Sequence, residues 1–245
     1  MQNLTDYVKA SRQARYSLTL ALPLLLLYEG LAWAMSQSDA VSVRNGADVL
    51  LKTVFAMLGG RTGITVFSVL LLGVGAWFVV KDRRSHPGRL IPSYLGLMVV
   101  ESVVYAALLG TVVSSLSALL LPGGLAFVQG GSFGQLTFGT QLVVSLGAGL
   151  YEELLFRVLL VSGFLALGLW LGWKRWVAVA VAVVASALIF SGFHYIGPLG
   201  DTLTLPSFTF RAVAGLVLSG LYVGRGFGIV AWSHALYDVG IAVMT

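Results

Sequence analysis

Long apolar stretches separated by short polar segments dominate the chain. Each stretch approaches or exceeds the roughly 17–25 residues that an α-helix needs to cross a lipid bilayer. Since only helices and closed barrels satisfy their backbone hydrogen bonds inside lipid, runs of this length predict transmembrane helices. The predicted spans are residues 16–35, 64–80, 93–121, about 137–171, 177–195, 207–223 and 228–244.

One further apolar segment, residues 47–58, is too short to span a bilayer alone. It carries Asp48 and Lys52, which share one face of a helix because they are four positions apart. This pattern is typical of an interfacial or re-entrant helix. The fold predicted is all-α, a polytopic bundle of seven or eight transmembrane helices, with glycines dividing region 137–171.

Composition agrees with a membrane location. Hydrophobic residues make up 58% of the 245 positions and charged residues only 10%, against about 25% charged in soluble domains. Soluble and disordered proteins are therefore excluded. The net charge of +5 comes from short basic clusters beside apolar runs, so nucleic-acid binding is not expected. With no cysteine, the chain has no disulfide and no thiolate ligand.

The basic clusters predict an orientation. The N-terminal tail, residues 81–89, Lys174 with Arg175, and Arg225 fall on one side if segment 47–58 does not cross. The positive-inside rule makes that side the cytoplasm and places the C-terminus outside. If the segment crosses, everything after it inverts. No repeat or soluble domain interrupts the chain, so residues 1–245 are predicted to form a single transmembrane domain.

Ionisable residues inside the apolar stretches indicate a functional site, because a charge at the bilayer centre costs about 2.5–3.5 kcal/mol on insertion scales. Glu152, Glu153 and Arg157 lie within one predicted helix. Glu153 and Arg157 are four positions apart and can pair, whereas Glu152 points about 100° away. One carboxylate would thus be neutralised, and the other would remain free to accept a proton.

Two histidines join this group. His194 ends a long uncharged stretch, and an antiparallel hairpin turning near residues 173–176 would set it level with Glu152. His234 and Asp238 are four positions apart on the last helix. Straight helices would leave His234 short of that level, so a tilt or kink is needed, with Gly163, Gly168 and Gly172 as candidate positions for a kink.

The three motifs together resemble those of the CPBP intramembrane proteases, also called the CAAX protease and bacteriocin-processing (Abi) family. They are Glu-Glu-x-x-x-Arg (Glu152, Glu153, Arg157), Phe-x-x-x-His (Phe190, His194) and His-x-x-x-Asn/Asp (His234, Asp238). The resemblance covers about residues 137–245, the expected catalytic core. It implies a helical core with a conical intramembrane cavity, and an endopeptidase with the six motif residues Glu152, Glu153, Arg157, His194, His234 and Asp238 in its site.

The resemblance also implies roles for these residues. Glu152 would activate water, Glu153 with Arg157 would support it, and the histidines with Asp238 would stabilise the oxyanion. Asp238 stands where the eukaryotic prenyl-protein endopeptidases have Asn, which indicates the prokaryotic branch. Because an ionised Asp cannot donate a hydrogen bond, we expect Asp238 to orient His234.

Other functions remain open at this level. A proton- or ion-coupled transporter also uses buried Glu, His and Arg, although the repeat halves typical of transporters are not found. A non-catalytic membrane immunity or scaffold protein is the other alternative. We expect no cofactor, but Glu152, His194 and His234 have the composition of a catalytic zinc site. Against zinc stand the absence of a His-x-x-x-His spacing and the charge of Arg157.

The expected partners are the lipid bilayer and a membrane-associated protein or peptide substrate. The expected location is the prokaryotic inner (plasma) membrane, as a multi-pass integral protein. Two further intramembrane carboxylates, Glu29 and Glu101, have no assigned role, and Arg211 or hydroxyl groups are their candidate partners.

Overall fold

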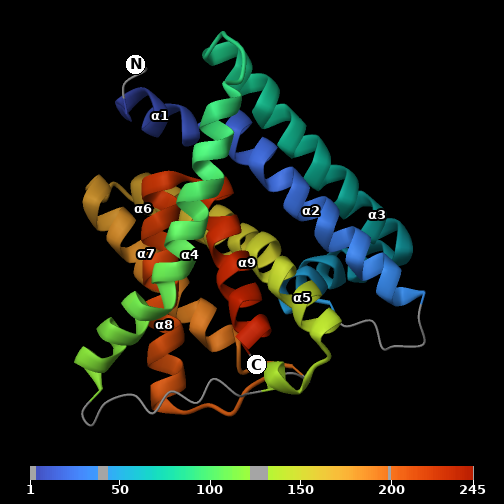
Figure 1. Ribbon diagram of the computed structural model, residues 1–245. Coiled ribbons are helices and arrows are strands. Elements are labelled where there is room, and N and C mark those ends of the chain that lie inside the picture. The colour runs from blue at the N-terminus through green and yellow to red at the C-terminus, as the bar shows by residue number, and fades with distance from the viewer. Residues whose placement is uncertain (1–3, 38–43, 122–131, 198–199, 245) are drawn as a thin grey trace.

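The structure, a computed structural model, describes residues 4–37, 44–121, 132–197 and 200–244, and these ranges contain helices and no β-strand (Figure 1). The helical elements in chain order are α1 (Leu4–Ser11), α2 (Ala14–Ser36), α3 (Gly46–Ser85), α4 (Pro92–Leu120), η1 (Ser132–Gln135), α5 (Phe138–Gly147), η2 (Ala148–Val161), α6 (Ser162–Trp170), α7 (Arg175–Phe193), α8 (Leu205–Arg225) and α9 (Phe227–Met244).

Seven helices in the described ranges are long and apolar enough to cross a membrane. They are α2, α3, α4, the continuous helix Phe138–Trp170 formed by α5, η2 and α6, and then α7, α8 and α9. The predicted all-α polytopic fold is therefore confirmed, with seven candidate spans. The outward-facing leucines, valines and isoleucines of these helices, such as Leu108 at 52% exposure, are what a lipid-facing surface requires.

α9 occupies the middle of the bundle and contacts α2, α4, α5, η2 and α8 (Figure 1). Its residues Ile229, Val230, Ala231 and Ala235 have no exposed surface. The last helix of the sequence is therefore the helix around which the others pack.

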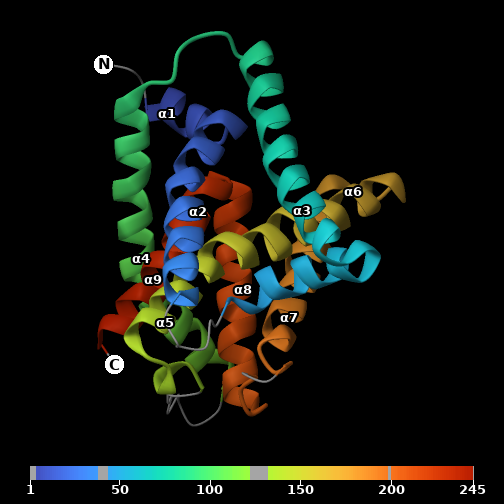
Figure 2. The same ribbon diagram turned by 90° about the vertical axis from the view of Figure 1, so that its right-hand side faces the viewer.

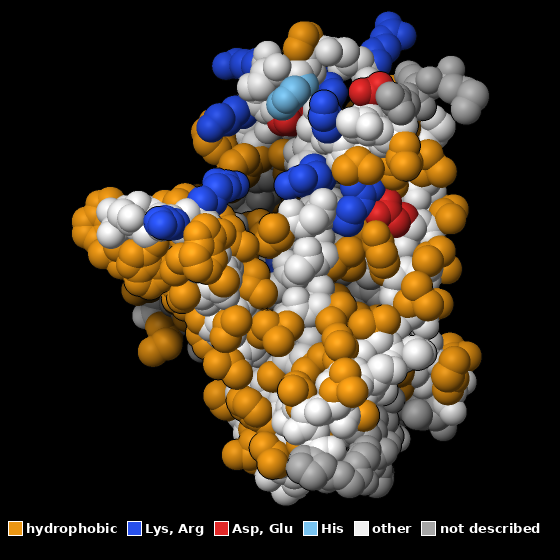
Figure 3. Space-filling model, turned by 90° about the vertical axis from the view of Figure 1, so that its left-hand side faces the viewer, with side chains coloured by type: hydrophobic (Ala, Val, Ile, Leu, Met, Phe, Trp, Pro, Cys, Tyr) orange, Lys and Arg blue, Asp and Glu red, His pale blue; other side chains and the backbone are white. Residues whose placement is uncertain are grey.

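Basic segments meet at one end of the bundle. Arg12 donates a hydrogen bond to the Val223 carbonyl at 3.1 Å, and Arg15 donates to the carbonyls of His86 and Gly88 at 2.9 and 3.0 Å. Figure 3 shows Lys and Arg side chains gathered in the upper part of the molecule, above a mostly hydrophobic and uncharged surface. α9 ends at the opposite end (Figure 1). This is the arrangement expected if segment 47–58 does not cross.

α3 has two arms that meet at a kink. Gly59 and Gly60 have non-helical backbone angles, and Gly60 lies at φ +56°, a region that favours glycine. Figure 2 shows the first arm lying across the bundle and the second rising along it. Residues 47–58 are thus the transverse arm of one kinked helix, and the predicted pair of Asp48 and Lys52 forms, at 2.7 Å.

The sequence predicted that glycines divide region 137–171, and this prediction is wrong. α5, η2 and α6 follow one another without a break, and η2 has the wider π-helical winding. Gly163 and Gly168 lie inside regular α6, so they are not kinks, and Gly172 lies beyond it, in the turn before α7. Figure 2 shows this long helix running obliquely through the bundle. The tilt that sets Glu152 and His234 at the same depth is therefore a tilt of the whole helix and not a kink at a glycine.

Candidate active site

The six motif residues form one cluster where η2, the end of α7 and α9 meet. Glu153 Oε1 lies 2.7 Å from His234 Nδ1, and Glu152 Oε2 lies 4.0 Å from His194 Nε2. Asp238 Oδ2 lies 3.5 Å from His234 Nε2. Residues separated by up to about eighty positions in the sequence are thereby brought together within the membrane-spanning bundle.

Glu153 is the paired carboxylate of the two glutamates. Its Oε1 is 3.1 Å from Arg157 Nη1 as well as 2.7 Å from His234, and both Glu153 and Arg157 are fully buried. The guanidinium of Arg157 also lies 4.5 Å above the ring of Phe190, a cation–π contact. A charge this deeply buried needs an opposite charge, and Glu153 supplies it.

Glu152 is held by an amide group rather than by an arginine. Its Oε1 accepts a hydrogen bond of 2.8 Å from the side-chain amide of Asn45, whereas its Oε2 is buried and has no hydrogen-bond partner. The Nε2 of His194 lies 4.0 Å from Oε2. The predicted pair of Glu153 with Arg157 is present, and Oε2 of Glu153, like that of Glu152, is buried without a hydrogen-bond partner.

The histidine rings have fixed orientations. His194 Nδ1 is 2.8 Å from the Phe190 carbonyl, which can only accept, so Nδ1 carries a hydrogen and Nε2 faces Glu152. His234 directs Nδ1 to Glu153 and Nε2 to Asp238, its partner one helical turn away. Asp238 and His234 therefore face each other across one helical turn, as their spacing in the sequence predicted.

Aromatic rings wall the site. Phe190 is 3% exposed, and its ring centroid lies 4.7 Å from that of His194 and 6.1 Å from that of His234. Phe156 packs edge-on against both Phe190 and Phe193. These rings keep the imidazoles and carboxylates in an apolar surrounding, where their mutual electrostatic interactions are strong.

Two glycines let the helices of the site approach closely. A Cβ at Gly149 would lie 2.4 Å from the Ala231 carbonyl oxygen and 2.5 Å from the Ala235 Cβ, and one at Gly147 would lie 2.5 Å from the Asn45 Cβ. Glycine is therefore required where η2 meets α9 and where α5 meets the start of α3. Both residues come just before the glutamates, and small residues at such positions let membrane helices pack closely.

Asn45 is the residue of this site that the motifs did not identify. It lies 107 positions before Glu152, in a part of the chain that resembles the protease family only in being hydrophobic. Its signal in the sequence was that of an ordinary helix N-cap before Gly46, and nothing in that signal indicates a contact with a glutamate. Only the folded chain brings the two together.

The residues do not fit a zinc site. Both ring nitrogens of His234 face carboxylates, and His194 Nδ1 faces a backbone carbonyl. Of the four ring nitrogens of these two histidines, only Nε2 of His194 is therefore turned toward Glu152. A catalytic zinc requires three protein ligands. In the described part of the chain, no group of three His, Cys, Asp or Glu side chains is arranged to hold a metal ion.

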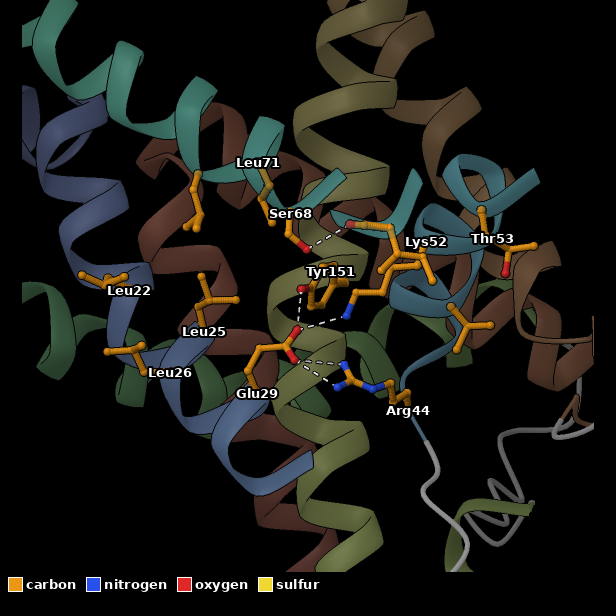
Figure 4. Close-up of a pocket in the computed structure, with 14 residues that line it drawn as sticks. Leu22, Leu25, Leu26, Glu29, Arg44, Lys52, Thr53, Ser68, Leu71 and Tyr151 are labelled. Carbon is orange, nitrogen blue, oxygen red and sulfur yellow. Dashed lines mark hydrogen bonds and ion pairs between the residues drawn. The ribbon is translucent and has the colours of Figure 1, made fainter. Parts of the chain in front are cut away.

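A pocket of about 630 Å³ lies beside the site, between α2 and the two arms of α3 (Figure 4). Apolar side chains such as Leu25 and Leu71 line most of it, and Glu29, Arg44, Lys52 and Tyr151 line its polar part. The polar part adjoins the site, because Arg44 precedes Asn45 and Tyr151 precedes Glu152 in the sequence.

The two unassigned carboxylates have clear partners. Glu29 accepts hydrogen bonds from Arg44, Lys52 and Tyr151 at 3.0 to 3.1 Å. Glu101 accepts from Arg225 and from the hydroxyl of Tyr7, at the basic end of the bundle. Arg211, a partner considered from the sequence, pairs with Asp201 instead. Hydroxyl groups, the other candidates, do bind both carboxylates.

Comparison with known proteins identifies the segment that carries this site. Residues 134–240 match the family model described as "Type II CAAX prenyl endopeptidase Rce1-like", and all six motif residues lie inside the match. No curated protein and no solved structure matches the chain. The family implies an intramembrane endopeptidase of the CAAX type. The segment 134–240 of this multi-pass membrane chain is a domain of the Rce1-like type II CAAX prenyl endopeptidase (CPBP) family.

Proposed function

We propose that this protein hydrolyses a peptide bond near the membrane surface, in a protein or lipid-modified tail, with a water molecule activated by Glu152. One observation supports this proposal above the others. Glu152 Oε1 is held by Asn45, and its buried Oε2 has no partner and faces His194 at 4.0 Å. Glu153 also has an oxygen without a partner, but its charge is paired with Arg157, which leaves Glu152 better suited to act as the general base.

The reaction begins with transfer of a proton from water to Glu152. The resulting hydroxide attacks the carbonyl carbon of the scissile peptide bond and forms a tetrahedral intermediate, whose oxygen carries the negative charge. Glu152 then gives its proton to the amide nitrogen, the C–N bond breaks, and the amine product leaves. Glu152 ends the cycle ionised, so the water has been consumed and no other co-reactant is needed.

In this mechanism His194 Nε2 donates to the oxyanion, and His234 acts through its positive charge, because its ring nitrogens already face Glu153 and Asp238. Because His194 Nδ1 donates to the Phe190 carbonyl, His194 can donate from Nε2 only as an imidazolium. Asp238 and Glu153 hold the ring of His234 from two sides, which fixes its orientation before substrate binds. Arg157 balances the charge of Glu153, so Glu153 does not compete with Glu152 for the proton. No metal ion takes part in this scheme.

The proposed substrate is a membrane-associated protein or peptide, because the site lies within the spanning helices and the family acts on C-terminal CAAX tails, in which a prenylated cysteine is the lipid anchor. The proposed location is the prokaryotic plasma membrane. Asp238 at the last motif position supports the prokaryotic branch.

Cleavage of defined peptides by the purified protein in liposomes tests the proposal. The probes are quenched fluorescent peptides ending in Cys-aliphatic-aliphatic-X, each made with and without a prenyl group on the cysteine. We expect cleavage of the prenylated peptides at the bond after the modified cysteine. Release of the tail from neither form would contradict the proposal. Proton or ion flux through the same liposomes, without cleavage, would favour a transporter instead.

A further inference from the structure

Asn45 is buried at 2% exposure and makes two hydrogen bonds with its side chain. Its Oδ1 accepts from the backbone N–H of Ala47 at 2.9 Å, and its Nδ2 donates to Glu152 Oε1 at 2.8 Å. The orientation of the amide follows from these neighbours. A backbone N–H requires the oxygen on one side, and a carboxylate requires the nitrogen on the other.

A network of ion pairs surrounds Asn45 on its own segment. Arg44 pairs with Asp48 at 2.9 Å and with Glu29 at 3.0 Å, and Lys52 pairs with the same two carboxylates at 2.7 and 3.1 Å. Figure 4 shows Glu29 between the two cations, with the Tyr151 hydroxyl beside it. The start of α3 is thus tied to α2 and to η2 at the residues next to Asn45 and Glu152.

Packing closes the same junction. The Tyr28 hydroxyl donates to Asp48 at 2.6 Å, and its ring contacts that of Tyr151 at 5.3 Å. Gly147 lies directly beneath the Asn45 side chain and the Tyr28 ring, with no space for a Cβ. The close contact with Gly147 and its two hydrogen bonds therefore hold Asn45 with its amide directed at Glu152.

We infer that Asn45 is a positioning residue for the proposed general base. It fixes Oε1 of Glu152 so that Oε2 faces His194, where the attacking water would bind. Asn45 lies outside residues 134–240, the segment that matches the protease family. The amino-terminal part of the chain thereby completes the active site, rather than only surrounding it with helices. This inference rests on the function proposed above.

The competing explanation is that Asn45 only caps α3. Two substitutions separate the roles, because Ser and Asp cap helices as well as Asn does. Asn45→Ser keeps the cap and removes the amide donor. Asn45→Asp keeps the cap and places a second acceptor against Glu152. Thr204→Ala is the matched control, since Thr204 caps α8 through the backbone N–H of Ser207 and has no contact with the site.

The experiment measures kcat, KM and melting temperature for these variants with the prenylated peptide. We expect Asn45→Ser to lower kcat about 10- to 100-fold, the effect of a misplaced catalytic group, with KM and melting temperature close to those of the unsubstituted protein. Asn45→Asp should lower kcat by at least the same factor. Thr204→Ala should lose some stability and keep its kcat.

Two outcomes would overturn the inference. In the first, Asn45→Ser and Asn45→Asp both keep full kcat while Glu152→Gln is inactive, so the proposed function stands and the role of Asn45 is wrong. In the second, the melting temperatures of the two Asn45 variants fall as that of Thr204→Ala does, and their activities fall only in proportion to this loss of stability. Full activity in Glu152→Gln would instead remove the proposed function itself, and with it the role of Asn45.

Discussion

Replacing Gly149 with alanine tests the close packing that the site requires. The new Cβ would lie 2.4 Å from the carbonyl oxygen of Ala231, 2.5 Å from the Ala235 Cβ and 2.8 Å from the Ala235 backbone nitrogen. Two of these three atoms belong to the backbone of α9, so no side-chain rotation relieves the overlap. η2 and α9 must therefore move apart.

The size of this movement follows from ordinary contact distances. Carbon and oxygen atoms in packed helices approach to roughly 3.3 Å, so the helices must separate by about 1 Å. Glu153 lies one turn after Gly149, and His234 is next to Ala235. Their 2.7 Å contact would lengthen to well beyond hydrogen-bond distance. Overpacking of this kind costs about 1–3 kcal/mol of folding free energy.

We expect Gly149→Ala to lower kcat about 100-fold, because a displacement of about 1 Å at a catalytic group has an effect of that order. Its melting temperature should fall by several degrees, at about 2–4 °C per kcal/mol for a chain of this size. The assay is peptide cleavage, with intrinsic tryptophan fluorescence as the measure of unfolding. Gly163→Ala is the control, since a Cβ there meets nothing within 4 Å and should stabilise α6 by about 0.5–1 kcal/mol.

Equal activity and stability of Gly149→Ala and Gly163→Ala would refute this reasoning. That result would mean that η2 and α9 are not packed at Gly149 as described.

Three further predictions follow from the buried charges and the arrangement of the helices. Arg157→Met should destabilise the protein by about 3–5 kcal/mol, measured by thermal unfolding, because it leaves Glu153 buried and unpaired. Glu153→Gln should lower both stability and kcat. A fully stable and active Arg157→Met would contradict the pairing. In this cysteine-free chain, an impermeant thiol reagent added outside cells should label Gly130→Cys and Thr245→Cys but not Ser85→Cys. Gly130 and Thr245 lie outside the described residues. Labelling of Ser85→Cys would reverse the predicted orientation. Cleavage should continue unchanged in 1,10-phenanthroline, whereas activity lost on chelation and restored by zinc would replace the glutamate mechanism with a metal one.

Much of the fold and the cluster could be predicted from the sequence because membrane solvation imposes strong patterns. Long apolar stretches predicted the spans, and the helical spacing of Glu153 with Arg157 predicted the observed pair. The His234 pairing with Asp238 follows from the same spacing. These features depend on local periodicity, which a single sequence records directly.

Other features depend on how the helices cross, and the sequence does not record this. The tilt and π-helical winding of η2 replaced the kink expected at Gly163, Gly168 or Gly172. Asn45 reaches Glu152 only because α3 kinks at Gly59 and Gly60 and turns its first arm toward η2. Contacts of this kind join distant segments and leave no periodic signal.

Substitution of Glu152 by glutamine tests whether this carboxylate activates the water. The variant keeps the size of the side chain and one oxygen that can accept from Asn45, but it cannot accept a proton from water. Glu101→Gln is the matched control, because Glu101 is also an intramembrane carboxylate but pairs with Arg225 and Tyr7, away from the site. With the prenylated peptide as substrate, we predict no measurable cleavage by Glu152→Gln and full kcat for Glu101→Gln. Full cleavage by folded Glu152→Gln would contradict the account.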